Sequence, residues 1–294
     1  KNFQSPELTY SSYIFSTKIK LDGGKVNPKW GQEFETDLYS KVYEVRNHKI
    51  EDNCYLVQNK NNELFFISPN GEIQWKKSVG NPIVGEIKSI DFLGNNKSQM
   101  MFTTKNQLYL VDILGRNVGQ FPVSIKDSIT ENVSILDYDN NQNFRFLVPT
   151  TRGIKSVDNK GNIVKGWSQP YVNKGVEGDI HHLLINNLDY ILVRDKSNSI
   201  SIFNRKGEVR HTVNATFGNP FYFKKGSTIE KTRATFLNKS NNTICKQFFS
   251  NSVPTILLSP SDKILDFFTL DFNLDKQSEY VLVFKNKKGP VSWP

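Results

Sequence analysis

The clearest chemical signal in this chain is a run of oxygen-bearing side chains near its C-terminal end. Counted from Asp271, these side chains stand at positions 1, 3, 5 and 9, as Asp271, Asn273, Asp275 and Glu279. Alternation along a tight turn places the first three groups on one side, and a later acid can close a cage of oxygen ligands. The spacing predicts a calcium site, although Lys276 stands where such loops usually carry glycine. The alternative is a turn in which Asp271 accepts hydrogen bonds from backbone amides.

A related run that starts at Asp137 does not predict a metal site. Asp139 and Asn141 match the third and fifth positions, but Arg145 stands at the ninth. A guanidinium group stays charged in proteins and would repel a calcium ion. We therefore discount this run as a calcium site.

The four histidines do not form a recognisable catalytic or metal-binding group. His181 and His182 are neighbours in a strand-like run, so their side chains are expected on opposite faces of a sheet. His48 and His211 stand apart from them in the sequence. No Gly-x-Ser-x-Gly elbow, His-Glu-x-x-His motif or phosphate-binding loop occurs. We therefore predict no catalytic and no cofactor-binding residues, and we expect that the protein is not an enzyme.

Charge and cysteine content narrow the range of partners. The net charge is +9 over 294 residues, but the basic residues are spread through the turns instead of being clustered with stacking aromatics. This distribution argues against a nucleic-acid partner. No stretch approaches the roughly 18 consecutive apolar residues of a membrane span, so we predict no transmembrane segment in this chain. Cys54 and Cys245 lie in separate strand-like runs without metal-ligand spacing, which predicts two free, buried thiols.

The elements that would position these residues recur along the chain. A strand-like run leads into a turn that ends in glycine, and an aromatic residue usually follows a few positions later. The glycines and aromatics are Gly24 with Trp30, Gly71 with Trp75, Gly115 with Phe121, Gly161 with Trp167, Gly207, and Gly289 with Trp293. The interval is about 45 residues, with room for one degenerate copy after Gly207, and such a period is typical of a propeller of repeated sheets.

Each period contains about four extended runs, one of which is almost entirely apolar. A strand that is apolar on both faces is expected between neighbouring sheets. The equivalent apolar residues of the successive copies are Val57, Phe102, Val148, Val193, Leu237 and Leu282. The pattern predicts an all-β fold: a single β-propeller domain over residues 1–294, built from four-stranded antiparallel blades, with an irregular segment at 1–12. We expect seven blades, with six and eight as the alternatives, and a long loop at 214–233.

The repeated phrase resembles that of quinoprotein-type (PQQ-like) β-propellers. The best copies are 108–121 and 64–75, and the resemblance covers about 13–294. That superfamily includes quinone-dependent dehydrogenases and cofactor-free scaffolds of outer-membrane assembly. The vicinal cysteine pair and the Trp-Gly-Asp phrase of the dehydrogenases are missing here, so the resemblance implies a scaffold without PQQ. Residues 271–279 are also similar to the calcium loop of FG-GAP (integrin-type) propeller repeats, apart from Lys276.

Together these observations lead to a functional hypothesis. We expect a non-catalytic interaction scaffold of the bacterial cell envelope, periplasmic or surface-exposed, that binds a protein partner. That partner would belong to an outer-membrane assembly or secretion complex and could be a membrane protein complex. The alternative is a calcium-assisted carbohydrate-binding propeller module, and turnover of a quinone or a glycoside is the third hypothesis. Calcium is the one cofactor that the sequence predicts.

Overall fold

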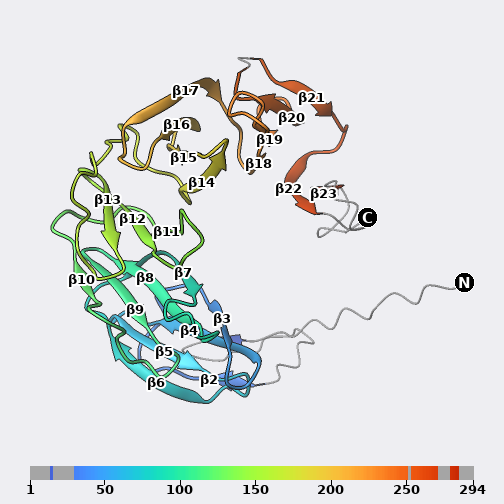
Figure 1. Cartoon of the computed structure of the whole chain (residues 1–294). Helices are drawn as coiled ribbons and strands as arrows, with labels where there is room; N and C mark the ends of the chain where they lie inside the picture. Colours follow the sequence, from blue (N-terminus) through green and yellow to red (C-terminus); the bar gives the residue numbers. More distant parts are fainter. Residues whose placement is uncertain (1–13, 16–29, 251–252, 271–278, 285–294) are drawn as a thin grey trace, which may run out of the picture. The chain divides into compact units, whose positions relative to one another are not determined.

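The fold is all-β, with successive antiparallel sheets that follow one another along the chain (Figure 1). The computed structural model describes residues 14–15, 30–250, 253–270 and 279–284, and every regular element within these ranges is a strand. None of these residues forms a helix with the length and apolar character that crossing a bilayer would require. The chain divides into two compact units, residues 1–133 with 160–162 and residues 134–159 with 163–294. The prediction of one domain over 1–294 stays a prediction.

The first unit contains two complete four-stranded sheets. In each of them, strands that are consecutive in sequence are neighbours in the sheet. The first sheet contains β3 (Tyr43–Asn47), β4 (Asp52–Gln58), β5 (Glu63–Ile67) and β6 (Ile73–Ser78). The second contains β7 (Ile83–Ile90), β8 (Gln99–Thr104), β9 (Gln107–Val111) and β10 (Val123–Ser124). A short parallel pair, β1 (Ile14–Phe15) and β2 (Gly31–Gln32), completes the described strands of this unit.

The second unit contains four sheets built in the same way. The three-stranded sheet contains β11 (Ser134–Leu136), β12 (Arg145–Thr150) and β13 (Gly153–Asp158). The two four-stranded sheets contain β14 (His181–Ile185), β15 (Leu188–Arg194), β16 (Ser199–Phe203) and β17 (Val209–Thr216), then β18 (Phe221–Lys224), β19 (Arg233–Asn238), β20 (Thr243–Phe248) and β21 (Thr255–Leu258). The last described sheet is the pair β22 (Ile264–Leu270) and β23 (Glu279–Phe284). The number of blades stays a prediction, because both ends of the chain lie outside the described residues.

The hydrophobic core lies between successive sheets, as the apolar inner runs predict. Leu56 and Phe66 of the first sheet belong to one buried cluster with Met100, Phe102 and Tyr109 of the second. Similar clusters join the β14–β17 sheet to the β18–β21 sheet, and the latter to the β22–β23 pair. Because each inner strand is covered on both faces, its side chains can all be apolar. The equivalent residues Val57, Phe102, Val148, Val193 and Leu237 are fully buried, and Leu282 is half-buried.

The glycine turns are in contact with tryptophans of the preceding repeats. Gly71 has a φ of +88°, and the ring of Trp30 lies so close that a Cβ at this position would be 2.6 Å from it. Gly115 has a φ of +79° and meets Trp75 in the same way at 2.9 Å. Glycine is therefore needed twice over, for the left-handed backbone and for the close approach of an indole ring.

Two local predictions differ from the structure. Residues 221–224, expected within a long loop, form β18, because the run Phe221-Tyr222-Phe223 packs its half-buried rings against the sheet core. The sheet that starts at β11 has three strands instead of four in the described part of the chain. Its fourth position is reduced to one bridge between Val157 and Ile163, and further along the amide of Ile154 donates to the carbonyl oxygen of Pro170 at 3.0 Å.

Candidate functional site

The predicted calcium loop connects β22 to β23. Asp271, Asn273 and Asp275 lie outside the described residues, and of Glu279 only the backbone position is described. That residue is the first of β23 and is paired with Leu270, the last residue of β22. The site therefore stays a prediction. In the described part of the chain, no group of three or more histidine, cysteine, aspartate or glutamate side chains could hold a metal ion.

Equivalent loops in two other sheets show a structural role for their first aspartate. In the loop between β7 and β8, the Asp91 carboxylate accepts hydrogen bonds from the backbone amides of Asn95 (3.1 Å) and Asn96 (2.8 Å). In the loop between β11 and β12, Asp137 accepts from the amides four and five residues on, at 3.1 and 2.9 Å. Both carboxylates close a turn. This is the role that the alternative interpretation gives to Asp271 in its own loop.

The densest group of charged side chains joins the β11–β12 loop to the β14–β17 sheet. Arg205 donates from both terminal nitrogens to Asp139, at 2.6 and 3.1 Å, and its Nε pairs with Asp189. The other carboxylate oxygen of Asp189 lies 2.7 Å from Nε2 of His182. The guanidinium also lies over the ring of Tyr138, 4.9 Å from its centroid.

Within this charge network, the electrostatic environment favours the ionised forms of Asp139 and Arg205 and the neutral form of Tyr138. Hydrogen bonds from Arg205 hold the pKa of Asp139 below its usual range. The hydrogen bond to Asp139 in turn raises the pKa of Arg205. Burial, and then the negative charge of Asp189, raise the pKa of Tyr138. The network joins Tyr138 and Asp139 of the β11–β12 loop to Arg205 and Asp189 of the next sheet, so it can fasten two sheets together.

The two neighbouring histidines face different sheets, as expected for adjacent strand residues. The ring of His182 meets the edge of Tyr138, with centroids 4.9 Å apart. The ring of His181 meets Phe223 of the next sheet, with centroids 4.8 Å apart. The two side chains therefore cannot act together on one ligand. Cys54 and Cys245 are buried and free, which confirms the thiol prediction.

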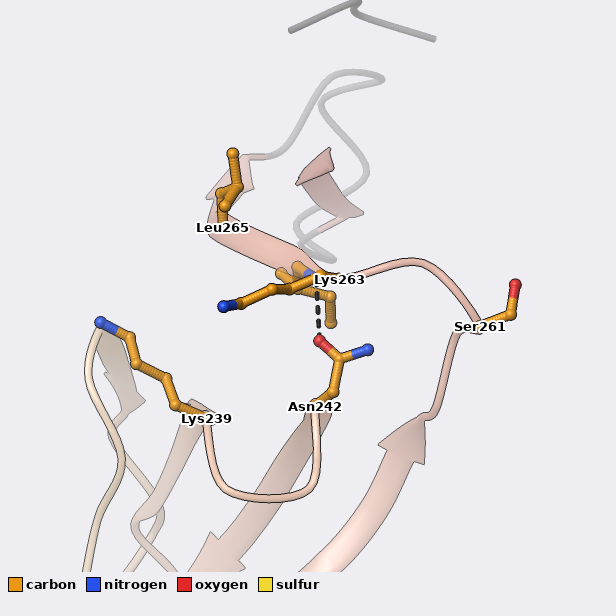
Figure 2. Close-up of a pocket in the computed structure, with 6 residues that line it drawn as sticks. Lys239, Asn242, Ser261, Lys263 and Leu265 are labelled. Carbon is orange, nitrogen blue, oxygen red and sulfur yellow. Dashed lines mark hydrogen bonds between the residues drawn. The ribbon is translucent and has the colours of Figure 1, made fainter. Parts of the chain in front are cut away.

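Two polar depressions lie on either side of the turn between β19 and β20. The first, of about 540 Å³, is lined by Lys239, Asn242, Ser261, Lys263, Ile264 and Leu265. Figure 2 shows Lys239 and Lys263 reaching from two different segments over the same hollow. Asn242 holds the segment 260–264 against the β19–β20 turn. Its side chain donates to the carbonyl oxygens of Pro260 and Asp262 and accepts from the amide of Ile264.

The second depression, of about 560 Å³, is lined by Asn198, Phe217, Gly218, Asn219, Phe236, Leu237, Asn238, Lys239 and Ser240. Behind its wall lies Arg194, which donates to Asn198 at 3.1 Å and lies over the ring of Phe221. Burial lowers the pKa of Arg194. Among the described residues that line either depression, none has an acidic side chain. This side of the sheet is therefore suited to anionic or amide-bearing groups.

An exposed apolar strand, β21, ends shortly before Ser261, which lines the first depression. All four residues of β21 are exposed, including Ile256 (56%), Leu257 (37%) and Leu258 (40%). Leu265 and Phe268 of the following strand are exposed as well. Sequence reasoning missed this surface, because a short aliphatic run is equally typical of a buried strand. Contiguous apolar surface of this kind marks sites of protein association.

Comparison with known proteins establishes a fold. No protein-family model and no curated protein sequence matches the chain. Two crystal structures of BBS1N in complex with ARL6DN, soaked with lead and with mercury, match at 12% identity, with TM-scores of 0.52 and 0.53. The matches cover 83% and 85% of this chain and 74% and 75% of those chains. BamB from Moraxella catarrhalis matches at 11% identity over 76% of this chain and 62% of that one, with a TM-score of 0.44. The BBS1N matches and the repeated antiparallel sheets make the fold a β-propeller.

Proposed function

We propose that this chain is a non-catalytic β-propeller scaffold that binds a protein partner. The observation that carries the proposal is the exposed apolar surface of β21, at Ile256, Leu257 and Leu258. A side chain of this type gains roughly 1.5–3 kcal/mol when it is fully removed from water. Three adjacent aliphatic residues on one outer strand therefore favour burial against another macromolecule over permanent exposure.

The charge of the chain adds to this argument. A net charge of +9 attracts an acidic partner over a distance of about one Debye length, roughly 8 Å at physiological salt. The described residues that line the two depressions include lysines and amides but no acid. Apolar contact would hold the complex, and the surrounding positive charge would speed its formation.

We propose that the protein functions in the bacterial cell envelope and that its partner belongs to an outer-membrane assembly or secretion complex. This part of the proposal rests on the resemblance of the repeated phrase to PQQ-like propellers, whose members include cofactor-free scaffolds. The partner could be a membrane protein complex.

The experiment is mild crosslinking of the native protein in intact cells, followed by purification and mass spectrometry of what it carries. We expect a reproducible protein partner whose rate of association falls as salt rises, while the formed complex survives moderate salt. A mutant of the outer strand of another sheet, Val209→Lys, should retain the same partner, since Val209 is exposed on β17. A protein that stays monomeric at every ionic strength, with nothing crosslinked to it, would contradict the proposal.

A further inference from the structure

The outer strand of the β18–β21 sheet differs from the outer strands of the other four-stranded sheets. β6 carries Lys76 and Lys77, β17 carries Arg210 and His211, and β10 is only two residues long. Charges and short length are the usual means by which an edge strand avoids pairing with another chain. β21 lacks charge, since no charged residue occurs in 251–261, and its four residues are interrupted by one bulge between Ile256 and Leu258.

The hydrogen-bonding edge of β21 is open on one side. Among the described strands its single sheet neighbour is β20, through the pairs Ile244 with Leu258 and Cys245 with Ile256. A strand at the edge of a sheet presents a row of backbone N–H and C=O groups that an added strand can satisfy. Pro254 and Pro260 bracket the strand, and proline cannot donate to a ladder. Pairing is therefore limited to the segment between these two residues.

The side chains of β21 are exposed on both faces of the sheet. Cross-strand partners share a face, and a bulge separates the pair Cys245 with Ile256 from the pair Ile244 with Leu258, so Ile256 and Leu258 point to opposite faces of the sheet. The three aliphatic residues are between 37% and 56% exposed. A strand that covers both faces needs aliphatic residues at successive positions, without polar alternation.

We propose that β21 receives an extended aliphatic segment of an acidic partner protein as a fifth strand of the β18–β21 sheet. This inference rests on the proposed function and adds the mode of binding. Charge selects the occupant, because a second copy of a chain with net charge +9 would be repelled, whereas an acidic partner is attracted. Two lysines reinforce this choice: Lys246 is the cross-strand partner of Thr255, and Lys263 follows the strand.

The test uses the purified chain and a synthetic peptide with a central run of valine and isoleucine, glutamates at both ends, and blocked termini. Binding is measured by fluorescence anisotropy, and protection of the backbone amides of residues 255–258 by hydrogen exchange. Ile256→Lys places a charge on the open strand and should weaken binding roughly tenfold or more. Val209→Lys is the matched control, because it places the same charge on an exposed position of the outer strand β17. Melting temperatures of both variants verify that they are folded.

A second peptide makes the test independent of protein variants. The same sequence with N-methyl groups on alternate amides, along the edge that faces β21, keeps its side chains but cannot form the ladder. The proposal expects protection of 255–258 by the first peptide, loss of binding with the N-methylated peptide and with Ile256→Lys, and no change with Val209→Lys. Absence of binding, binding without that protection, or equal binding to both variants would overturn it, while a partner recovered by crosslinking would still support the proposed function. Concentration-dependent dimers that Ile256→Lys abolishes would also overturn it, in favour of a second copy as the occupant.

Discussion

The indole Nε1 of Trp75 donates a hydrogen bond to the carbonyl oxygen of Ile113, 38 residues further along the chain, at 3.0 Å. The same ring packs on Gly115 of that turn and stacks on Phe66 of its own sheet, with ring centroids 5.1 Å apart. Trp30 repeats the arrangement with a hydrogen bond of 2.6 Å to the carbonyl oxygen of Pro69. A tryptophan of one repeat is thus fastened to the glycine turn of the next.

This contact predicts that Gly115→Ala destabilises the protein more than Gly119→Ala does. Both glycines have positive φ, at +79° and +59°, so both substitutions carry backbone strain of about 1 kcal/mol. Only Gly115 also meets an indole ring, since no atom lies within 4 Å of a Cβ at Gly119. We expect an additional loss of about 1–3 kcal/mol in the free energy of unfolding, measured by urea denaturation. Equal losses for the two variants would contradict the packing role of Trp75.

The charge network predicts an acid-dependent contribution from Asp139. Its pKa is lowered by hydrogen bonds from Arg205, so its contribution to stability is fully present above the ordinary carboxyl pKa of about 3.9. The contribution is lost as pH falls through the lower value of the folded state. We expect Asp139→Asn to be less stable than the unmodified protein at neutral pH and to converge with it in strong acid. The measurement is denaturant unfolding across pH, with Asp262→Asn, an exposed aspartate outside the network, as the control.

The raised pKa of Tyr43 predicts that the protein loses stability at alkaline pH. Burial, and then the charge of Glu86, raise its pKa to about 12. Folding therefore favours the neutral phenol, and this contribution is present below the ordinary pKa of about 10 and is lost between about pH 10 and 12. Tyr43→Phe should flatten the fall of the melting temperature over that range. Tyr171→Phe, at a side chain that is 65% exposed, should leave the fall unchanged. A fall that is the same in all three proteins would count against the inferred burial of the ionisable group.

The loop at Asp271 predicts a response to calcium. If Asp271, Asn273, Asp275 and Glu279 hold the ion at about 2.3–2.6 Å, calcium should raise the melting temperature and Asp271→Ala should abolish the rise. Asp137→Ala is the matched control, because Asp137 begins the equivalent loop between β11 and β12. Asp137→Ala should lower the melting temperature in the absence of calcium, because two hydrogen bonds are lost, without changing the rise that calcium causes. Equal melting temperatures in calcium and in chelator would leave only the turn-carboxylate alternative, and would also remove the basis of the carbohydrate-binding hypothesis.

Repetition explains how much of this fold the sequence could predict. Left-handed glycines, apolar inner strands and tryptophans are local signals that return every 45 residues or so, which is why the repeated sheets could be predicted. The contacts of Trp30 with Gly71 and of Trp75 with Gly115 join different repeats and were not predicted. The contact of Arg205 with Asp139 could not be predicted, because it joins residues 66 positions apart through the packing of two sheets. Nor could the exposure of β21 be predicted, because an aliphatic run has the same pattern whether or not something covers it.

The contact between Trp75 and the turn at Gly115, called the joint below, also affects how such a chain can gain or lose repeats during evolution. The turns at Gly71 and Gly115 each accept the preceding tryptophan, so a duplicated segment from this part of the chain carries both halves of the joint, whereas Gly161 meets Val123 in place of an aromatic ring. Trp167 is a departure, since its Nε1 bonds to Ile154 of its own sheet (2.6 Å) while its ring still approaches Gly207. Duplication or loss of a whole repeat at the gene level would therefore create few new interfaces. A breakpoint between a tryptophan and the next glycine turn would instead leave the indole ring without the turn on which it packs.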